Sequence, residues 1–231
     1  MKTIGLLGGM SWESSLNYYK IINEEVKARL GGHHSCKSLM YSVDFAEIEE
    51  LQHAGEWDRL TEMMINSAAR IKQGNADFLI ICTNTMHKMA EEIERNAGIQ
   101  VLHIADAAAE EIKARKIGKV GLLGTRFTME QDFYRERLSK KHGIDVIIPE
   151  EQDRQQIHDI IYNELVLGII KDSSRRTYLE IIEKLASMGA KGIVLGCTEI
   201  PLLVNQKDCE IELFDTTGIH AKAAVDLALK E

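Results

Sequence analysis

The sequence predicts an α/β protein made of two similar three-layer domains with mainly parallel sheets. Short apolar runs that end in Gly, Asn, Asp or Thr alternate with longer segments of helical period, and this alternation is typical of parallel sheets with helices on both faces. The segment TIGLLGG at residues 3–9 also recurs as KVGLLGT at residues 119–125. Gly5 and Gly121 are thus 121 − 5 = 116 residues apart, about half of the 231-residue chain, which indicates an internal pseudo-twofold duplication.

The individual elements follow from the same alternation. Strands are expected at the short apolar runs, residues 3–7, 37–42, 78–81, 100–103, 119–123, 145–148, 192–195 and 212–214. Helices are expected between them, at residues 14–30, 57–73, 88–97, 105–113, 130–142, 152–167, 174–188 and 219–229. The apolar run at the N-terminus is too short for a signal peptide or a membrane span. We therefore expect it to form the first core strand, and we expect no membrane partner.

Two polar motifs at strand ends support the duplication. ICTNTMH follows one expected strand at residues 81–87, and LGCTEIP follows another at residues 195–201. Cys82 and Cys197 are 197 − 82 = 115 residues apart, and Thr83 and Cys197 are 114 apart. Two matches in the same order at nearly one offset favour a repeat over chance similarity of apolar strands. We expect a first domain of residues 1–103 plus 208–231, because the last helix should return to it, and a second domain of residues 104–207.

Composition excludes several classes of function. Hydrophobic residues make up 45% of the chain, charged residues 28%, and the net charge is −8 with no basic cluster. This describes an ordinary globular protein and argues against a nucleic-acid partner. The four cysteines lack CxxC or zinc-knuckle spacing, and a chain of this length needs no disulfide. They are therefore expected to be free thiols in a reducing cytoplasm.

No cofactor or metal is expected. His33, His34 and Cys36 lie in an expected loop and would lack a fourth zinc ligand. The glycines that follow the first strand match neither a dinucleotide fingerprint nor a P-loop. No lysine stands at a strand end beside a phosphate-binding glycine loop, which argues against a pyridoxal-phosphate enzyme.

Cys197 is the first candidate for catalysis. Ligands of open parallel sheets bind beyond the carboxyl ends of the strands, and Cys197 follows Gly196 at such an end. Pro201 suits the first turn of a helix, so free backbone N–H groups are expected just beyond the thiol, where they would lower its pKa and bind a carboxylate. The alternative is a structural buried cysteine.

Hydroxyl and amide side chains gather at several strand ends. They are Thr83, Asn84, Thr85, Thr125, Thr128 and Thr198. Helix capping explains some of them. Their number at several strand ends favours a site for a small anionic ligand.

Five motifs together resemble the aspartate/glutamate racemase family, from the first strand to the last helix. They are Gly8-Gly9-Met10-Ser11, Thr83-Asn84-Thr85-Met86-His87, Gly124-Thr125-Arg126-Phe127-Thr128, Gly196-Cys197-Thr198-Glu199 and Phe214-Asp215-Thr216. The resemblance implies a cofactor-independent amino-acid racemase with two similar α/β domains, an active site in the cleft between them, and a homodimer. In this family two cysteines flank the α-carbon of the substrate, one removing its proton and the other returning one to the opposite face.

The resemblance also implies roles for single residues. Asn84, Thr85 and Thr198 would bind the α-carboxylate and stabilise negative charge that develops during proton abstraction. Met10 and Ser11 would lie near the substrate side chain. Lys171 resembles a family lysine that reaches a substrate carboxylate, with a solvated surface lysine as the alternative. Glu199 would support Cys197 or simply begin a helix.

This chain departs from the family pattern at the first cysteine. The family motif is Cys-Asn-Thr-x-His, and Thr83 stands where that cysteine belongs. Cys82 is one residue earlier and should point to the opposite face of the strand; aligning Cys82 with Cys197 instead would break the register of the motif. We therefore expect an asymmetric pair, in which Cys197 removes the proton and Thr83 or a water returns one, with a preference for the L enantiomer.

A second departure concerns the substrate. The family arginine after the second strand has no match in residues 42–47, and arginine gives bidentate recognition of carboxylates. A broad-specificity amino-acid racemase is therefore an alternative to an aspartate or glutamate racemase. Two further alternatives are a single-cysteine isomerase, hydantoin racemase or decarboxylase of the same superfamily, and an amino-acid binding protein with a degenerate site.

Overall fold

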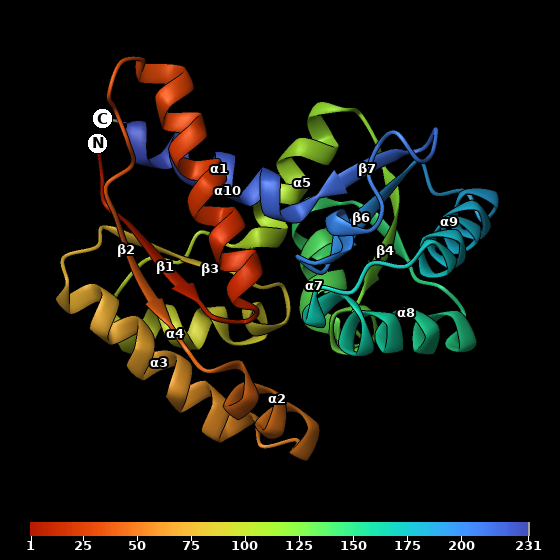
Figure 1. The fold of residues 1–231 in the computed structure, drawn as a ribbon, viewed down its shortest axis with the longest axis horizontal. Helices are drawn as coiled ribbons and strands as arrows, with labels where there is room; N and C mark the ends of the chain where they lie inside the picture. Colours follow the sequence, from red (N-terminus) through yellow and green to blue (C-terminus); the bar gives the residue numbers. More distant parts are fainter. Residues whose placement is uncertain (231) are drawn as a thin grey trace. The chain divides into compact units, whose positions relative to one another are not determined.

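The computed structural model describes residues 1–230, which fold into two compact units. Unit 1 contains Met1–Ile104 together with the segment from His220 onward, and unit 2 contains Ala105–Ile219. Each unit has one parallel sheet, in the order β2-β1-β3 in unit 1 and β5-β4-β6-β7 in unit 2. The two-sheet α/β architecture expected from the duplication is confirmed (Figure 1).

Unit 1 places its sheet between two layers of helices (Figure 1). Its elements are β1 (Ile4–Gly8), α1 (Trp12–Leu30), β2 (Ser38–Ser42), α2 (Phe45–Ala54), α3 (Trp57–Gln73), β3 (Phe78–Ile81), the 3₁₀ turn η1 (Thr85–Met89), α4 (Ala90–Ala97) and most of α10 (Thr216–Leu229). Alternate residues of β1 and β3 pack in opposite directions. Leu79 and Ile81 pack in one apolar cluster with residues of α3 and α4, whereas Phe78 and Ile80 pack in another with residues of α1 and α10.

Unit 2 repeats this strand order and adds a strand. Its elements are α5 (Ile104–Ala114, whose first residue belongs to unit 1), β4 (Lys119–Gly124), α6 (Arg126–Glu130), α7 (Asp132–Glu136), the π-helical turn η2 (Arg137–Lys141), β5 (Asp145–Ile147), α8 (Glu151–Asn163), η3 (Leu165–Leu167), α9 (Asp172–Ser187), β6 (Gly192–Gly196), η4 (Ile200–Leu202) and β7 (Glu212–Asp215). β4, β5 and β6 stand in the same order as β1, β2 and β3. β7 pairs with β6, so residues 208–219, which the sequence analysis assigned to the first domain, lie in unit 2.

Some expected elements differ from the structure. Residues 100–103 form a single bridge, Val101 with Leu79, rather than a strand. α2 was not expected, although Asp44 accepts a hydrogen bond from the Ala46 N–H at its start and Gly55 takes a left-handed conformation at its end. The helix expected at residues 130–142 is divided, because Gln131 is extended and the chain continues as α7 and η2. Within residues 1–230, no helix combines the length and the apolar character that crossing a membrane requires.

Candidate active site

In unit 1 the predicted residues lie at the carboxyl ends of β1 and β3. The strands are adjacent, with Leu7 opposite Ile81 and the Cys82 N–H donating to the Leu7 carbonyl at 2.9 Å. Beyond β3, Thr83 is half-buried, and its hydroxyl makes no hydrogen bond to any residue that the structure describes. Asn84 and Thr85 follow it and are buried. Asn84 makes no side-chain capping bond to η1, so the capping interpretation does not account for it.

Met10 and Ser11 lie beyond β1 at the same edge of the sheet. Both are buried, and the Ser11 hydroxyl accepts a hydrogen bond from the Ser14 N–H at 3.4 Å at the start of α1. The turn before them needs Gly9, which has φ +98°, and an added Cβ there would lie 2.2 Å from the Val43 carbonyl oxygen. The backbone at Gly9 therefore packs directly against the backbone of Val43.

Cys82 points away from this edge. Its side chain is fully buried in the apolar cluster formed with residues of α1 and α10. Burial raises the pKa of its thiol far above the ordinary value, because a thiolate is poorly solvated there. Cys82 is therefore a structural cysteine, as the alternation of side chains along a strand predicted.

In unit 2 the second group of predicted residues gathers beyond β6. The Cys197 thiol donates to Glu199 Oε2 at 3.0 Å, and the Thr198 hydroxyl donates to the same oxygen at 2.9 Å. All three side chains are buried. Pro201 stands in the first turn of η4, as its position in the sequence predicted.

Opposing influences act on the Cys197 thiol. Burial raises its pKa well above the ordinary value, and the neighbouring Glu199 charge and hydrogen bond raise it further. The backbone N–H groups of Glu199 and Thr198 act in the other direction by stabilising the thiolate. The effect of burial and of Glu199 is larger, so the thiol is protonated in the free protein.

Thr125 and Thr128 lie at the same edge of this sheet. Gly124 of β4 pairs with Gly196 of β6, so Thr125 and Cys197 each follow one member of this pair. The Thr125 side chain accepts from the Thr128 N–H at the start of α6, and the two hydroxyls are 3.3 Å apart. Both residues are buried. These threonines therefore cap a helix and also stand beside Cys197 in the sheet.

The strand registers make Thr83 and Cys197 equivalent positions of the two sheets. Leu7 pairs with Ile81 in unit 1, and Leu123 pairs with Leu195 in unit 2. Leu7 and Leu123 are 123 − 7 = 116 residues apart, the offset of the sequence repeat. Thr83 lies two residues beyond Ile81 in one sheet, and Cys197 lies two residues beyond Leu195 in the other. Cys82 corresponds instead to Gly196.

Lys171 lies outside these strand ends. It precedes α9, its side chain is 53% exposed, and it forms an ion pair of 3.1 Å with Glu164. Where the family arginine would be expected, Asp44 begins α2 instead. The segment after β2 therefore contains no arginine. Lys171 is engaged in an ion pair at the surface of unit 2.

Two polar residues at this edge of unit 2, Thr216 and Thr217, were given no site role from the sequence, although Thr216 belongs to one of the five motifs. The Thr216 hydroxyl donates to the Leu195 carbonyl at 2.7 Å. The next residue, Thr217, is fully buried, and its hydroxyl makes no hydrogen bond within the described residues. Both follow β7, the neighbour of β6. The Asp-Thr-Thr motif after the last expected strand was the signal that could have identified them.

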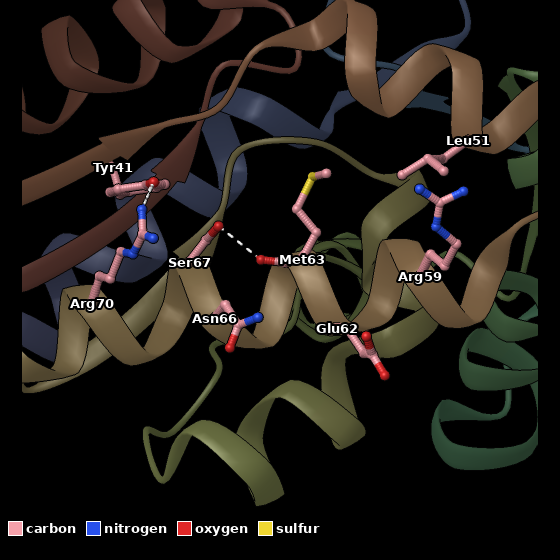
Figure 2. A pocket seen from close by; sticks show the side chains of 8 residues that line it. All are labelled: Tyr41, Leu51, Arg59, Glu62, Met63, Asn66, Ser67 and Arg70. Atoms are coloured by element: carbon pink, nitrogen blue, oxygen red, sulfur yellow. Dashed lines mark hydrogen bonds between the residues drawn. The ribbon is translucent and has the colours of Figure 1, made fainter.

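A pocket in unit 1 contains none of the predicted site residues. It has a volume of about 360 Å³ and lies along one face of α3 beside β2 and α2 (Figure 2). Its lining residues are Tyr41, Leu51, Arg59, Glu62, Met63, Asn66, Ser67 and Arg70. Figure 2 shows that Arg70 is turned toward Tyr41, to whose hydroxyl it donates a hydrogen bond.

Comparisons with known proteins agree with the motifs at these strand ends. The chain is 23% identical over 235 residues to the broad specificity amino-acid racemase RacX of Bacillus subtilis (strain 168), covering 98% of each chain. It is similar to the crystal structure of a candidate Asp/Glu racemase from Yersinia pestis, with 55% identity, a TM-score of 0.93 and 100% of both chains covered. An aspartate racemase homologue from Pyrococcus horikoshii OT3 has 34% identity, a TM-score of 0.86 and the same coverage. Residues 7–224 match the family model of the Asp/Glu/hydantoin racemases, and the chain therefore belongs to that family.

Proposed function

We propose that this protein is a cofactor-independent racemase of aspartate, glutamate or related amino acids, in which Cys197 and Thr83 act on opposite faces of one α-carbon. The observation that carries the proposal is that the two residues occupy equivalent positions in the two sheets. Thr83 lies two residues beyond Ile81, and Cys197 lies two residues beyond Leu195, the equivalent residue of the second sheet. Cys197 is an ionisable thiol beside a carboxylate and two backbone N–H groups. The Thr83 hydroxyl is unengaged among the described residues and can donate a proton.

The proposed reaction moves protons only. The Cys197 thiol first gives its proton to water, and the resulting thiolate takes the α-proton of the L substrate. The Cα–H bond breaks, an S–H bond forms, and the electron pair is delocalised into the α-carboxylate. A proton from the Thr83 hydroxyl, or from a water beside it, then bonds to the other face of the α-carbon. Water restores the Thr83 proton, and Cys197 is again a thiol. No oxidant, reductant or cofactor is consumed.

The surrounding polar groups have proposed roles in binding. Asn84, Thr85 and Thr198 hold the α-carboxylate, and Thr125 and Thr128 add hydroxyl groups beside Cys197. Preorganised donors of this kind stabilise the charge that develops as the α-proton leaves. Met10 and Ser11 contact the substrate side chain, Glu199 orients the thiol, and Lys171 exchanges Glu164 for a substrate carboxylate. The substrate ammonium supplies the positive charge that favours the Cys197 thiolate.

A broad substrate range is a second candidate function. Its specific support is the segment after β2, where Asp44 begins a helix and no arginine offers bidentate carboxylate recognition. The relative RacX is itself named a broad specificity amino-acid racemase. A panel of L amino acids with acidic, basic, polar and apolar side chains distinguishes the two ranges.

Exchange of the α-proton in heavy water tests the function directly. The two enantiomers have equal free energies in water, so kcat/KM for inversion must be the same in both directions. The asymmetric pair therefore shows in exchange. The S–H that Cys197 forms exchanges with heavy water and returns a deuteron to the same face, so the α-carbon of the L substrate should be deuterated faster than it is inverted. D substrates should exchange slowly. NMR follows the deuteration and chiral chromatography follows the inversion.

Three variants complete this test. Cys197→Ser should lower exchange and inversion by about 100-fold or more, the usual contribution of a general base, and Thr83→Cys should raise exchange of D substrates. Cys82→Ala is the matched control at a buried cysteine and should leave both rates near those of the wild type. Equal exchange of both enantiomers, or full activity of Cys197→Ser, would contradict the mechanism; a pure binding protein would deuterate no amino acid.

By resemblance to the family, we also propose that the active form is a cytoplasmic homodimer. Light scattering coupled to size-exclusion chromatography should give about twice the mass of the 26.0 kDa chain. A monomer at the concentrations used for turnover would contradict this assembly.

A further inference from the structure

His87 connects the backbone of Thr83 to the end of the first segment of unit 1. It is buried in η1, four residues after Thr83. Its Nδ1 lies 2.8 Å from the Thr83 carbonyl oxygen, and the Ile104 N–H donates to its Nε2 at 3.2 Å. Both contacts lie within unit 1, because the first segment of that unit ends at Ile104.

These two partners determine the tautomer of the ring. A carbonyl oxygen only accepts hydrogen bonds, so Nδ1 must carry the proton that it donates to Thr83. A backbone N–H only donates, so Nε2 must be unprotonated to accept from Ile104. His87 is therefore neutral and donates from one defined nitrogen, and neither contact survives rotation of the ring by half a turn.

Neighbouring rings hold His87 in this orientation. The ring of His103 is 4.6 Å away and that of His220 is 5.5 Å away, measured between centroids. The His220 ring is itself held at both nitrogens, with Nε2 2.8 Å from the Leu102 carbonyl and Nδ1 2.9 Å from the Tyr18 hydroxyl. All of these side chains are buried. The Thr83 carbonyl is thus fixed by a packed cluster and not by a mobile surface group.

We propose that His87 is a positioning residue, whose Nδ1–H sets the orientation of Thr83 and so controls the reprotonation step. This inference rests on the proposed function of Thr83. The Thr83 hydroxyl belongs to the same residue whose carbonyl oxygen contacts His87. Within the described residues, no hydrogen bond of its own orients that hydroxyl. A weak proton donor gains most from accurate placement, because an error of about 1 Å can cost up to about 100-fold in rate.

Two amide variants separate the two contacts of the ring. In His87→Asn the side-chain amide lies where Nδ1 was and can still donate to the Thr83 carbonyl. In His87→Gln the amide lies where Nε2 was, so it can serve Ile104 but not Thr83. We measure the ratio of inversion to α-deuteration of L-aspartate in heavy water, because deuteration by Cys197 does not require Thr83.

The expected result is a ratio lowered by about 10-fold in His87→Gln, with the deuteration rate close to wild type, and a ratio largely retained in His87→Asn. Tyr18→Phe is the control, since it loosens the same cluster without touching either contact of His87; it should lower the melting temperature and leave the ratio unchanged. A parallel loss of inversion and deuteration in both His87 variants would reduce His87 to a structural role and overturn the proposal.

A measurement on the unaltered protein keeps the proposal testable if a variant fails to fold. The ¹⁵N spectrum of histidine-labelled protein should show His87 as the neutral tautomer protonated at Nδ1, and a ring protonated at Nε2 would overturn the proposal. The proposed function fails separately, if the wild type deuterates no amino acid at all.

Discussion

Cys197 must change its protonation state to act as a base, and its neighbours determine how that happens. Burial and the Glu199 carboxylate hold the thiol protonated, while two backbone N–H groups already point at the sulfur. A bound ammonium group would offset the Glu199 charge. The free protein therefore holds a protonated, less reactive thiol, and the proposed mechanism requires the substrate to activate it.

The substitution Glu199→Gln tests this balance of charges. Removing the carboxylate removes an influence that raises the Cys197 pKa, so the pKa should fall and the thiolate fraction at pH 8 should rise. Alkylation of Cys197 by iodoacetamide, measured at the Cys197 peptide by mass spectrometry, should therefore be about 10-fold faster. Cys36 and Cys209, which are partly exposed, are internal controls whose rates should not change. Unchanged or slower alkylation of Cys197 would refute the role of Glu199.

At the scale of elements, the ends of β4 and β6 leave no room for a side chain at Gly124 or Gly196. A Cβ added to Gly124 would lie 2.8 Å from the Gly196 carbonyl oxygen, and one added to Gly196 would lie 2.8 Å from the Leu123 carbonyl oxygen. Backbone atoms cannot move aside as the tip of a side chain can. Glycine at these positions therefore brings Thr125 and Cys197 to adjacent strand ends.

The substitution Gly196→Ala should force these strands apart. We expect a loss of about 1–3 kcal/mol in the free energy of unfolding, and a lower kcat because Cys197 is the next residue. Urea denaturation measures the first effect. Gly118→Ala is the matched control in the same unit, since an added Cβ there meets no atom within 4 Å. If the two variants are equally stable, the close approach does not constrain the strands.

The elements also show what the sequence could and could not predict. The strands that contain Gly5 and Gly121 were predictable, because continuous apolar runs are typical of parallel strands buried on both faces. Residues 100–103 were also expected to form a strand but form one bridge, and the Leu102 carbonyl accepts from His220 instead of from a neighbouring strand. That contact joins residues 118 positions apart and leaves no local signal. The repeat left Cys82 and Thr83 both open as the partner of Cys197, and the resemblance to the family motif selected Thr83, whereas the contacts of His87 required the structure.

At the scale of the whole molecule, unit 1 is discontinuous and its last segment is tied to its first helix. Ala221, Ala224 and Val225 of α10 share an apolar cluster with residues of α1 and β1. The hydrogen bond between Tyr18 and His220 joins residues 202 positions apart. The last helix was expected from the sequence to return to the first domain, because no helix of the first half corresponds to it. We expect the buried histidine at that return to make the stability of the fold depend on pH.

The pKa of His220 gives this dependence its direction. Burial lowers the pKa to about 4 from the ordinary 6.5, although the Leu102 carbonyl opposes the shift. The groups that face the ring, Tyr18, His87 and Leu102, include no carboxylate to stabilise a charged form. Between these two pKa values the unfolded chain binds more protons than the folded one. The free energy of unfolding should therefore be greatest above pH 6.5 and fall as the pH is lowered toward 4.

The substitution His220→Gln should remove this contribution. From pH 7 to pH 5 the His220 share of the loss is about 2 kcal/mol, and urea denaturation at the two pH values measures it. Glutamine retains an amide that can donate to Leu102 but does not titrate, so the variant should lose less stability over this interval, whatever its stability at pH 7. Tyr18→Phe keeps the imidazole and should retain a decrease like that of the wild type. If His220→Gln loses as much stability as the wild type, another group must cause the acid sensitivity, because a group that no longer titrates cannot contribute to the slope.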